Sequence, residues 1–487
     1  MSSTETSERL VIGLIVAALG LAVAAGVVVT SAVSVLLLPV PFALMAGAGL
    51  ALLALHEPRW ALLLTFLTMP FERMMALFPA EGTSQQGILS TLTVTKVMLL
   101  LIVPIWLVRT LVLKDSGVFR KTFASPGPTI ALVFAFYTTI SLVNAVSLGS
   151  YLKNQSTNVS NVVLFIFVLN VMDDKRWVLR SMGVLFLGYV AVGLMGVYEV
   201  TTQTHILELM GRTLPEEAWA ISSKAFRPAG PSGDPDYFAT SILFGLMLTL
   251  AVWRFLKPWW ISLALLCLVG VFLFNIFATG SRGAMLGFLV GMAAFFWFLE
   301  MPYKVPVLAL AIVGGLAGFT SYTLFVSARA AGRYSGGETK SLDYRLGWQR
   351  QCFGMIEANP VFGVGMGNSV FTQDRFFDPR PPRRPYNAAN SYVQLAAEAG
   401  IPSVVLYLGF VALVLLLLMG VIGKSPDPEI RHLATCLFAA LGAFFVFAAT
   451  AHALYNELTW SLLGLSVSLG QAAPGPAAGP AASRAAS

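Results

Sequence analysis

Residues 329–402 read RAAGRYSGGETKSLDYRLGWQRQCFGMIEANPVFGVGMGNSVFTQDRFFDPRPPRRPYNAANSYVQLAAEAGIP, and they form the longest polar interruption between apolar segments of this chain. Basic residues outnumber acidic ones within this stretch. The segments on both sides contain apolar runs of about twenty residues, which is the length that a helix needs to cross a bilayer. This alternation predicts a bundle of spanning helices with one large loop at a membrane face.

The overall composition excludes a soluble protein. Hydrophobic residues make up 57% of the 487 positions and charged residues only 11%, whereas soluble proteins carry about 25% charged residues. The net charge of +7 is first explained by basic loops that orient membrane helices, so nucleic acid is not an expected partner. Three widely separated cysteines offer no disulfide framework and no CxxC metal site. We expect an all-α polytopic membrane protein without a metal ion or cofactor.

Apolar runs predict roughly 12–14 spanning helices. The first run follows a polar segment of mixed charge without a small-residue cleavage pattern, so we expect an uncleaved helix there. The predicted spans are 10–30, 33–55, 60–78, 91–113, 128–149, 156–173, 177–199, 236–256, 259–279, 283–300, 305–325, 403–423, 431–452 and 456–471.

The distribution of lysine and arginine predicts the orientation of these spans. Alternate short connections are rich in basic residues, for example Arg59, Lys175 and Arg176, and the opposite set is poor in them. Both termini are therefore expected in the cytoplasm, with the segment 200–235, the turn at 278–284 and the long loop on the outer face. Because long loops are exempt from this rule, the charge of the loop remains available for function.

This topology divides the chain into four parts. Residues 1–325 would form about eleven spanning helices that include the outer segment 200–235, and residues 326–402 the large outer loop. Residues 403–471 would form the C-terminal spanning helices. The Ala/Pro-rich residues 472–487 cannot bury a core and are expected to be disordered.

The long loop has helical signals of its own. Apolar residues at helical spacing predict a helix over 342–357, which Asn359-Pro360 ends. A second helix is expected to begin near Ser391, where Ser391 and Gln394 have the spacing of a capping box. Between them, glycines at 363, 365 and 367 resemble a nucleotide-binding loop, but no βαβ unit surrounds them, so a turn between loop helices is expected.

Two outer-face arginines stand where apolar helices begin or end. Arg227 lies in FRPAGPSGDPDYFA, before the span that starts near residue 236, and Arg282 lies in the turn FATGSRGAMLGF. An arginine at a membrane interface either anchors a helix by snorkelling or has a partner or ligand. Because Gly280, Ser281 and Gly283 leave the head group of Arg282 accessible, a phosphate ligand is favoured there, and arginine suits phosphate oxygens.

These motifs, in the order FRPAGPSGDPDYFA, TGSRGAMLG, DYRLGWQRQCFGMIEANPVFGVGMGN and NSYVQLAAEAGIP, resemble the O-antigen ligase and Wzy-type polymerase superfamily of bacterial envelope proteins. The resemblance covers about 225–420. It implies an inverting, metal-independent glycosyltransferase at the periplasmic face of the inner membrane. The implied donor is a polyprenyl diphosphate-linked glycan, and the acceptor is a lipid-linked sugar: lipid A core for a ligase, or another carrier-bound repeat for a polymerase. Membrane lipids surround the bundle.

The resemblance implies roles for individual residues, and one of them is missing. Arg227 and Arg282 match the family's arginines and would stabilise the diphosphate leaving group. The family commonly has a histidine directly before the asparagine of an HNxYL-like motif, whereas this chain has Ala389 before Asn390. We assign catalytic roles to Arg282, Arg227, Glu398 and His452, and substrate-binding roles to Arg345, Trp348, Arg350, Asn390, Tyr392 and Asp234.

Three interpretations of Ala389 stay open. Another group, with Glu398 and His452 as the first candidates and Asp343 and Glu457 as further ones, acts in place of the histidine. Alternatively, the chemistry differs or is lost, or the substitution was engineered to inactivate the protein. A rival function is a transporter of lipid-linked glycans, but transporters place charge near the bilayer midplane and often in repeated halves, which this chain lacks. A catalytically inert glycan-binding protein is the remaining alternative.

Overall fold

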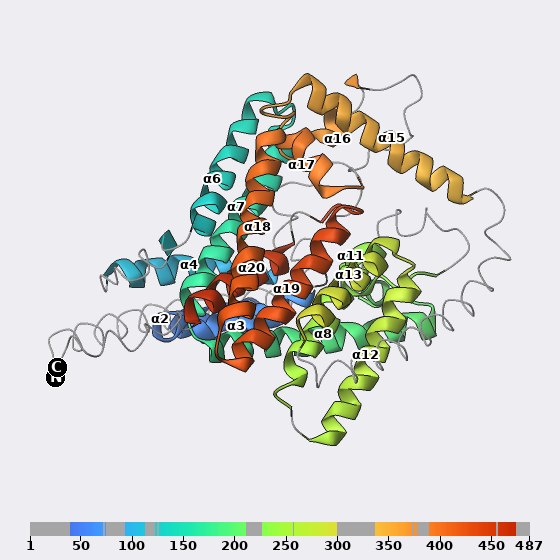
Figure 1. The fold of residues 1–487 in the computed structure, drawn as a ribbon. Helices are drawn as coiled ribbons and strands as arrows, with labels where there is room; N and C mark the ends of the chain where they lie inside the picture. The colour runs from blue at the N-terminus through green and yellow to red at the C-terminus, as the bar shows by residue number, and fades with distance from the viewer. Residues whose placement is uncertain are drawn as a thin grey trace, which may run out of the picture.

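The computed structural model describes residues 39–71, 74, 93–112, 122–123, 126–210, 226–256, 258–299, 337–372, 375–376, 389–453 and 456–473. The predicted spans at 10–30 and 305–325, and the tail after residue 473, lie outside these residues. All the regular elements of the described part are helices (Figure 1).

Seven helices of the described part are long and apolar enough to cross a membrane, so the chain is an all-α polytopic membrane protein as predicted. Their bounds fall within a few residues of the predicted spans, and the one predicted over 128–149 ends in a short 3-10 turn, η4 (Ser141–Asn144). The next helix, predicted over 156–173, begins earlier, at Leu148. The seven are α4 (Val94–Val112), α6 with η4 (Pro126–Asn144), α8 (Lys175–Thr202), α11 (Pro235–Trp253), α12 (Trp259–Thr279), α18 (Ile401–Lys424) and α19 (Pro428–Ala448).

Further helices complete the bundle. They are α2 (Pro39–His56), α3 (Pro58–Thr68), α7 (Leu148–Val171), α13 (Arg282–Phe298) and α20 (Glu457–Ala472). The span predicted over 60–78 is wrong in its extent, because α3 has only 11 residues and continues as a 3-10 turn to Phe71. At 1.5 Å per residue, α3 alone is too short to cross a bilayer.

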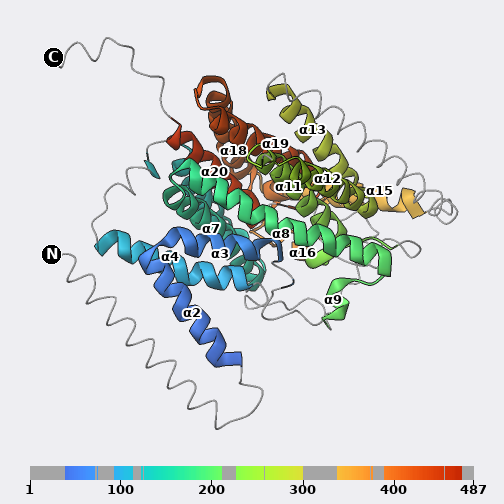
Figure 2. The same ribbon diagram turned by 90° about the horizontal axis from the view of Figure 1, so that it is seen from below.

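Helix α8 lies between α3 on one side and α11 and α12 on the other (Figure 2). On the far side of α11, helix α13 packs closely on α19. The sequence permits this approach because Gly283, Gly287 and Gly291 recur every fourth residue, and small residues let membrane helices come close. A Cβ atom at Gly287 would lie 2.6 Å from the carbonyl oxygen of Ala443 in α19. The α13–α19 pair therefore fixes where the first turn of α13, with Arg282, is placed.

A second tight contact joins α7 and α20. The fully buried Trp460 of α20 stacks on Phe410 and packs against Phe134, Phe165 and Tyr407. Here too a glycine allows the contact, because Gly464 of α20 lies against Val168 and the backbone of Phe165. These aromatic side chains tie α6, α7, α18 and α20 into one body, on which the loop helices rest (Figure 1).

The connections gather in two groups. The α17 end is formed by residues 144–148, 199–206, 226–235, 279–282, 359–368 and 449–453, together with the loop helices α15 (Gly337–Ala358), α16 (Ser369–Thr372) and α17 (Ser391–Ala399). The α3 end is formed by residues 56–58, 171–175, 253–256 and 424–428. At the α17 end, Asn144 donates to the Gly363 carbonyl (2.8 Å) and Asn368 accepts from the Ser147 amide (2.6 Å). At the α3 end, Arg59 pairs with Asp173 and Lys175 with Asp427.

The helices predicted within the loop are present. Helix α15 covers the predicted 342–357 and extends to both sides, and α17 begins at Ser391. The predicted capping box is wrong, because Asn390 is the N-cap and its Oδ1 accepts from the Tyr392 and Val393 amides (2.9 and 3.1 Å). The glycines at 363, 365 and 367 form a turn as predicted. All three have positive φ values of 64°, 100° and 69°, which other residues rarely adopt.

Candidate active site at the α17 end of the bundle

Arg227 is held against the turn between α12 and α13. Its Nε donates to the Thr279 carbonyl (2.6 Å), and its guanidinium also contacts Asp236 Oδ1 (3.3 Å). Asp234, a predicted substrate-binding residue, caps α11 by accepting from the Asp236 and Tyr237 amides. Two of the five N–H groups of the arginine are thus used to fix it, and three remain for a ligand.

Arg282 is the first residue of α13, three positions after the carbonyl that Arg227 binds. It is exposed, and Ser281 before it is the N-cap residue. The next residue, Gly283, lies against Thr450 of the α19–α20 connection, and a side chain at position 283 would collide with that threonine. The structure therefore brings Arg227 and Arg282 to one turn, and brings that turn to the end of α19.

The start of α17 reaches the same connection. Ser391 Oγ donates to the Ala451 carbonyl (2.7 Å) and accepts from the Ala453 amide (2.8 Å), so these two bonds bracket the half-buried His452. Ala389, which stands where the resemblance implies histidine, is two residues before Ser391 and also half-buried. His452 is thus held beside the beginning of α17, the helix that Ala389 precedes by two residues.

Tyr392 faces the bundle. Its hydroxyl donates to the Phe445 carbonyl of α19 (2.7 Å), and burial raises the pKa of Tyr392 well above its ordinary value. The phenol therefore stays protonated and acts as an anchor between α17 and α19. Asn390, as the N-cap, likewise has its side-chain oxygen committed to the backbone. Both predicted substrate-binding residues therefore use these side-chain groups to bind other parts of the protein.

Glu398 is fully buried and organises the glycine turn. Its two oxygens accept from the Gly367 amide (2.9 Å), the Ser369 hydroxyl (2.7 Å) and the Gln394 amide group (2.9 Å). Burial, with the charge of Glu398, raises the pKa of the nearby Cys352 thiol to about 12, so this thiol stays neutral. A carboxylate whose two oxygens both accept hydrogen bonds and that has no exposed surface is suited to holding a loop.

The predicted residues of α15 stand apart from this arrangement. Helix α15 packs on α17 through Cys352 and Met355. Trp348, one turn before Cys352, is half-buried, and Arg350 is exposed. Arg345 falls on α15, and its side chain lies outside the described part, as does that of Asp343.

Several residues of this site were missed at the sequence level. Thr279, Thr450 and Ala451 act through backbone carbonyls or close packing, and neither leaves a signal in residue type. Ser391 was noticed as a cap, but its hydroxyl bridges to residues 60 or more positions away. Within the described ranges, no group of three or more His, Cys, Asp or Glu side chains gathers as a metal site would require.

A comparison with protein-family models is informative about this end of the molecule. Residues 267–408 match the family described as O-Antigen ligase, a range that includes Arg282, α15 and the whole of α17. Arg227 and His452 lie outside the matched range. Arg227 bonds to Thr279 within it, and Ser391 within it bonds to the residues on both sides of His452. No curated protein matches the chain. The chain is thus a polytopic membrane protein in which residues 267–408 are similar to the O-antigen ligase family.

Proposed function

We propose that this protein transfers a glycan from a polyprenyl diphosphate carrier to a hydroxyl group of a lipid-linked sugar at the periplasmic face of the bacterial inner membrane. The observation that carries the proposal is the convergence of two arginines on one turn within the range that resembles the ligase family: Arg227 bonds to Thr279, and Arg282 follows Thr279 by three residues. A pair of guanidinium groups suits a diphosphate, because each group can bind two oxygens in one plane.

The reaction is a displacement at the anomeric carbon of the donor. The acceptor oxygen forms a bond to this carbon while the bond to the carrier diphosphate breaks, and the electron pair leaves with the diphosphate. Arg227 and Arg282 stabilise the negative charge that develops on the leaving group. Attack opposite to the leaving group inverts the anomeric configuration, and the acceptor hydroxyl gives its proton to a base.

His452 is our proposed base. It is held beside the start of α17 by the two hydrogen bonds of Ser391, and its connection also packs on the first turn of α13 through Thr450. An imidazole at this place can accept the proton that a histidine at 389 would accept. Of the two leading candidates, Glu398 is less suited, since its oxygens already accept three hydrogen bonds inside the α17 end.

The test is a transfer assay with the purified protein in nanodiscs. A polyprenyl diphosphate glycan is supplied with either a lipid A core acceptor or a second carrier-bound glycan, and released carrier diphosphate is measured. Release with the core acceptor supports a ligase, and release with the second carrier-bound glycan would reassign the protein as a polymerase. Absence of release with every acceptor would refute glycan transfer.

A further inference from the structure

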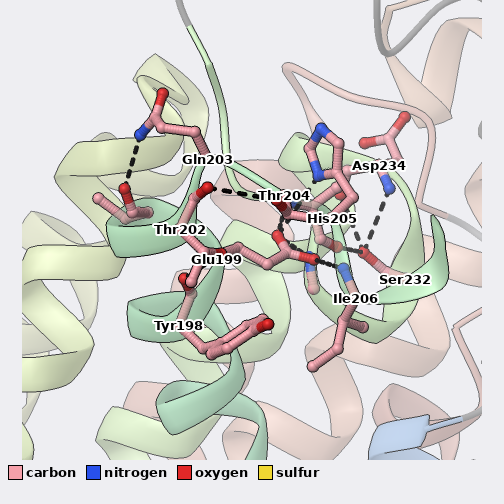
Figure 3. Close-up of polar contacts among 12 residues, drawn as sticks. Tyr198, Glu199, Thr202, Gln203, Thr204, His205, Ile206, Ser232 and Asp234 are labelled. Carbon is pink, nitrogen blue, oxygen red and sulfur yellow. Dashed lines mark hydrogen bonds and ion pairs between the residues drawn. The ribbon is translucent and has the colours of Figure 1, made fainter. Parts of the chain in front are cut away.

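A buried carboxylate at the end of α8 binds the backbone of the segment that carries Arg227. Glu199 has no exposed surface, and its side chain points between α9 (Ile206–Leu209) and the chain before α11 (Figure 3). Oε1 accepts from the Ile206 amide (2.8 Å), and Oε2 accepts from the Ala229 and Gly230 amides (2.7 and 2.9 Å). One side chain therefore fixes two separate backbone segments.

A carboxylate is needed for this arrangement. Both of its oxygens are occupied by N–H donors, and hydrogen bonds to an ionised acceptor are the ones that offset the cost of burying the charge. A glutamine at 199 would turn an NH2 group toward one set of backbone N–H groups and leave that set without an acceptor. The residue type thus matches the three backbone donors.

His205 supplies a second hold on the same segment. Its Nδ1 lies 3.5 Å from Glu199 Oε2, and its ring stacks on that of Phe226, with the centroids 4.4 Å apart. Phe226 comes directly before Arg227, and the Glu199-bound Ala229 comes two residues after it. The backbone of Arg227 is therefore held on both sides by groups that meet at Glu199.

Residues 226–230 pack closely against the neighbouring helices. Gly230 lies against the ring of Phe238 in α11, so that a side chain at 230 would overlap this ring. One turn before Glu199, Gly196 lies against Phe238 and Asn275, and a side chain there would overlap both. Helices α8, α11 and α12 thus meet around residues 226–230, and the Glu199 carboxylate holds this segment against them.

From these contacts we infer that Glu199 is a positioning residue of the donor site, which acts through the backbone of 226–230 to aim Arg227 at the carrier diphosphate. This inference rests on the proposed function. Glu199 itself does not reach the donor, because it has no exposed surface and its oxygens are bound to the backbone. Its effect should therefore be specific for the donor and absent for the acceptor.

The first test measures the protection of the amides that Glu199 binds, and it does not depend on activity. In Glu199→Gln, hydrogen–deuterium exchange of the amides at 206, 229 and 230 should accelerate at one of the two backbone segments by roughly 10-fold or more, which corresponds to the loss of a hydrogen bond to a charged group. The matched control is Glu208→Gln, which makes the same change of charge on α9 outside these bonds. Unchanged exchange at both segments in Glu199→Gln would overturn the inference.

The second test reads the consequence for transfer. In Glu199→Gln, kcat/KM for the donor should fall on the order of 100-fold, as misplacement of a binding group by about 1 Å can cause, while KM for the acceptor stays unchanged. Glu199→Asp, which keeps the charge, should recover part of the loss. In an Arg227→Lys background, Glu199→Gln should cost much less, because the group that it aims is gone.

The outcomes separate the inference from the proposed function. Faster exchange without any change in the donor constants, or an equal loss in both backgrounds, would make Glu199 a purely structural residue and overturn its positioning role. If the unmodified protein transfers no glycan to any acceptor, the proposed function fails, and the exchange experiment still decides whether Glu199 holds the segment of Arg227.

Discussion

The two ends of the bundle use their charged residues in different ways. At the α3 end, cations pair mainly with carboxylates from other connections and helices: Arg59 with Asp173 (2.7 Å), and Lys175 with Asp427 and Glu429 (2.5 and 2.8 Å). Arg59 also donates to the Val171 carbonyl (3.2 Å). These side chains are partly exposed, and such pairs each contribute at most about 1 kcal/mol. They join parts of the chain at a surface.

At the α17 end, charged side chains that are buried or half-buried bind mainly backbone groups, alongside the ion pair of Arg227 with Asp236. Arg227 binds the Thr279 carbonyl, Glu199 binds three amides, and Glu398 binds the Gly367 amide. Because backbone groups in turns lack helical partners, such bonds determine the path of the chain. Charged groups at the α17 end therefore shape loops, and this is where we place catalysis.

The largest expected effect is at Arg282. Replacement by alanine should reduce glycan transfer on the order of 1000-fold, because it removes a donor aimed at the charge of the leaving group. The measurement is release of carrier diphosphate in nanodiscs, with size-exclusion profile and thermal unfolding as checks of folding. Lys175→Ala at the α3 end is the control and should keep full turnover. Equal activity of the two variants would break the comparison between the ends.

Loss of His452 should have the next largest effect. His452→Gln should slow transfer about 100-fold or more, as expected for the loss of a general base, and should remove the acidic limb of the pH–rate profile. The second variant, Ala389→His in the His452→Gln background, places imidazole at the neighbouring position and should restore part of the rate. A normal rate and pH profile in His452→Gln would exclude His452 as the base.

Glu398 distinguishes a structural carboxylate from a catalytic one. In Glu398→Gln, one of the three donors to this side chain loses its acceptor, which should lower the free energy of unfolding by about 1–3 kcal/mol. Transfer by the folded fraction should change far less than in His452→Gln. Unfolding is followed by heating in detergent. A 100-fold loss of turnover with unaltered stability would instead identify Glu398 as the base.

The smallest effect concerns the α3 end and pH. The hydrogen bond from Lys175 is the main cause that lowers the pKa of Asp427. Stability from Asp427 should therefore be present above its unfolded pKa of about 3.9 and be lost as the pH falls through its lower folded value. Lys175→Ala should remove at most about 1 kcal/mol near neutral pH. Thermal unfolding with and without high salt measures this, and a larger, salt-independent loss would contradict a surface pair.

Hydrophobic runs predicted the long helices well, because a bilayer requires about twenty apolar residues whatever the neighbours are. The same argument failed at 60–78, where α3 ends at Thr68. At Ser391 the residue type predicted a hydrogen bond, but its partners could not be predicted. Serine caps helices locally, yet here Asn390 does so, and the serine hydroxyl bonds to Ala451 and Ala453.

The amino-acid sequence predicted the membrane class, most of the helix positions in the described part, the glycine turn and the arginines worth testing. These follow from local chemistry: apolar length, backbone conformation and the cost of charge at an interface. The tertiary structure was needed to show that Arg227 bonds to the turn before Arg282 and that His452 lies beside the start of α17. It was also needed to show that Glu199 and Glu398 bind backbone amides. Each of these depends on hydrogen bonds between main-chain groups and side chains distant along the chain or in another turn, and main-chain groups are the same at nearly every position of a sequence.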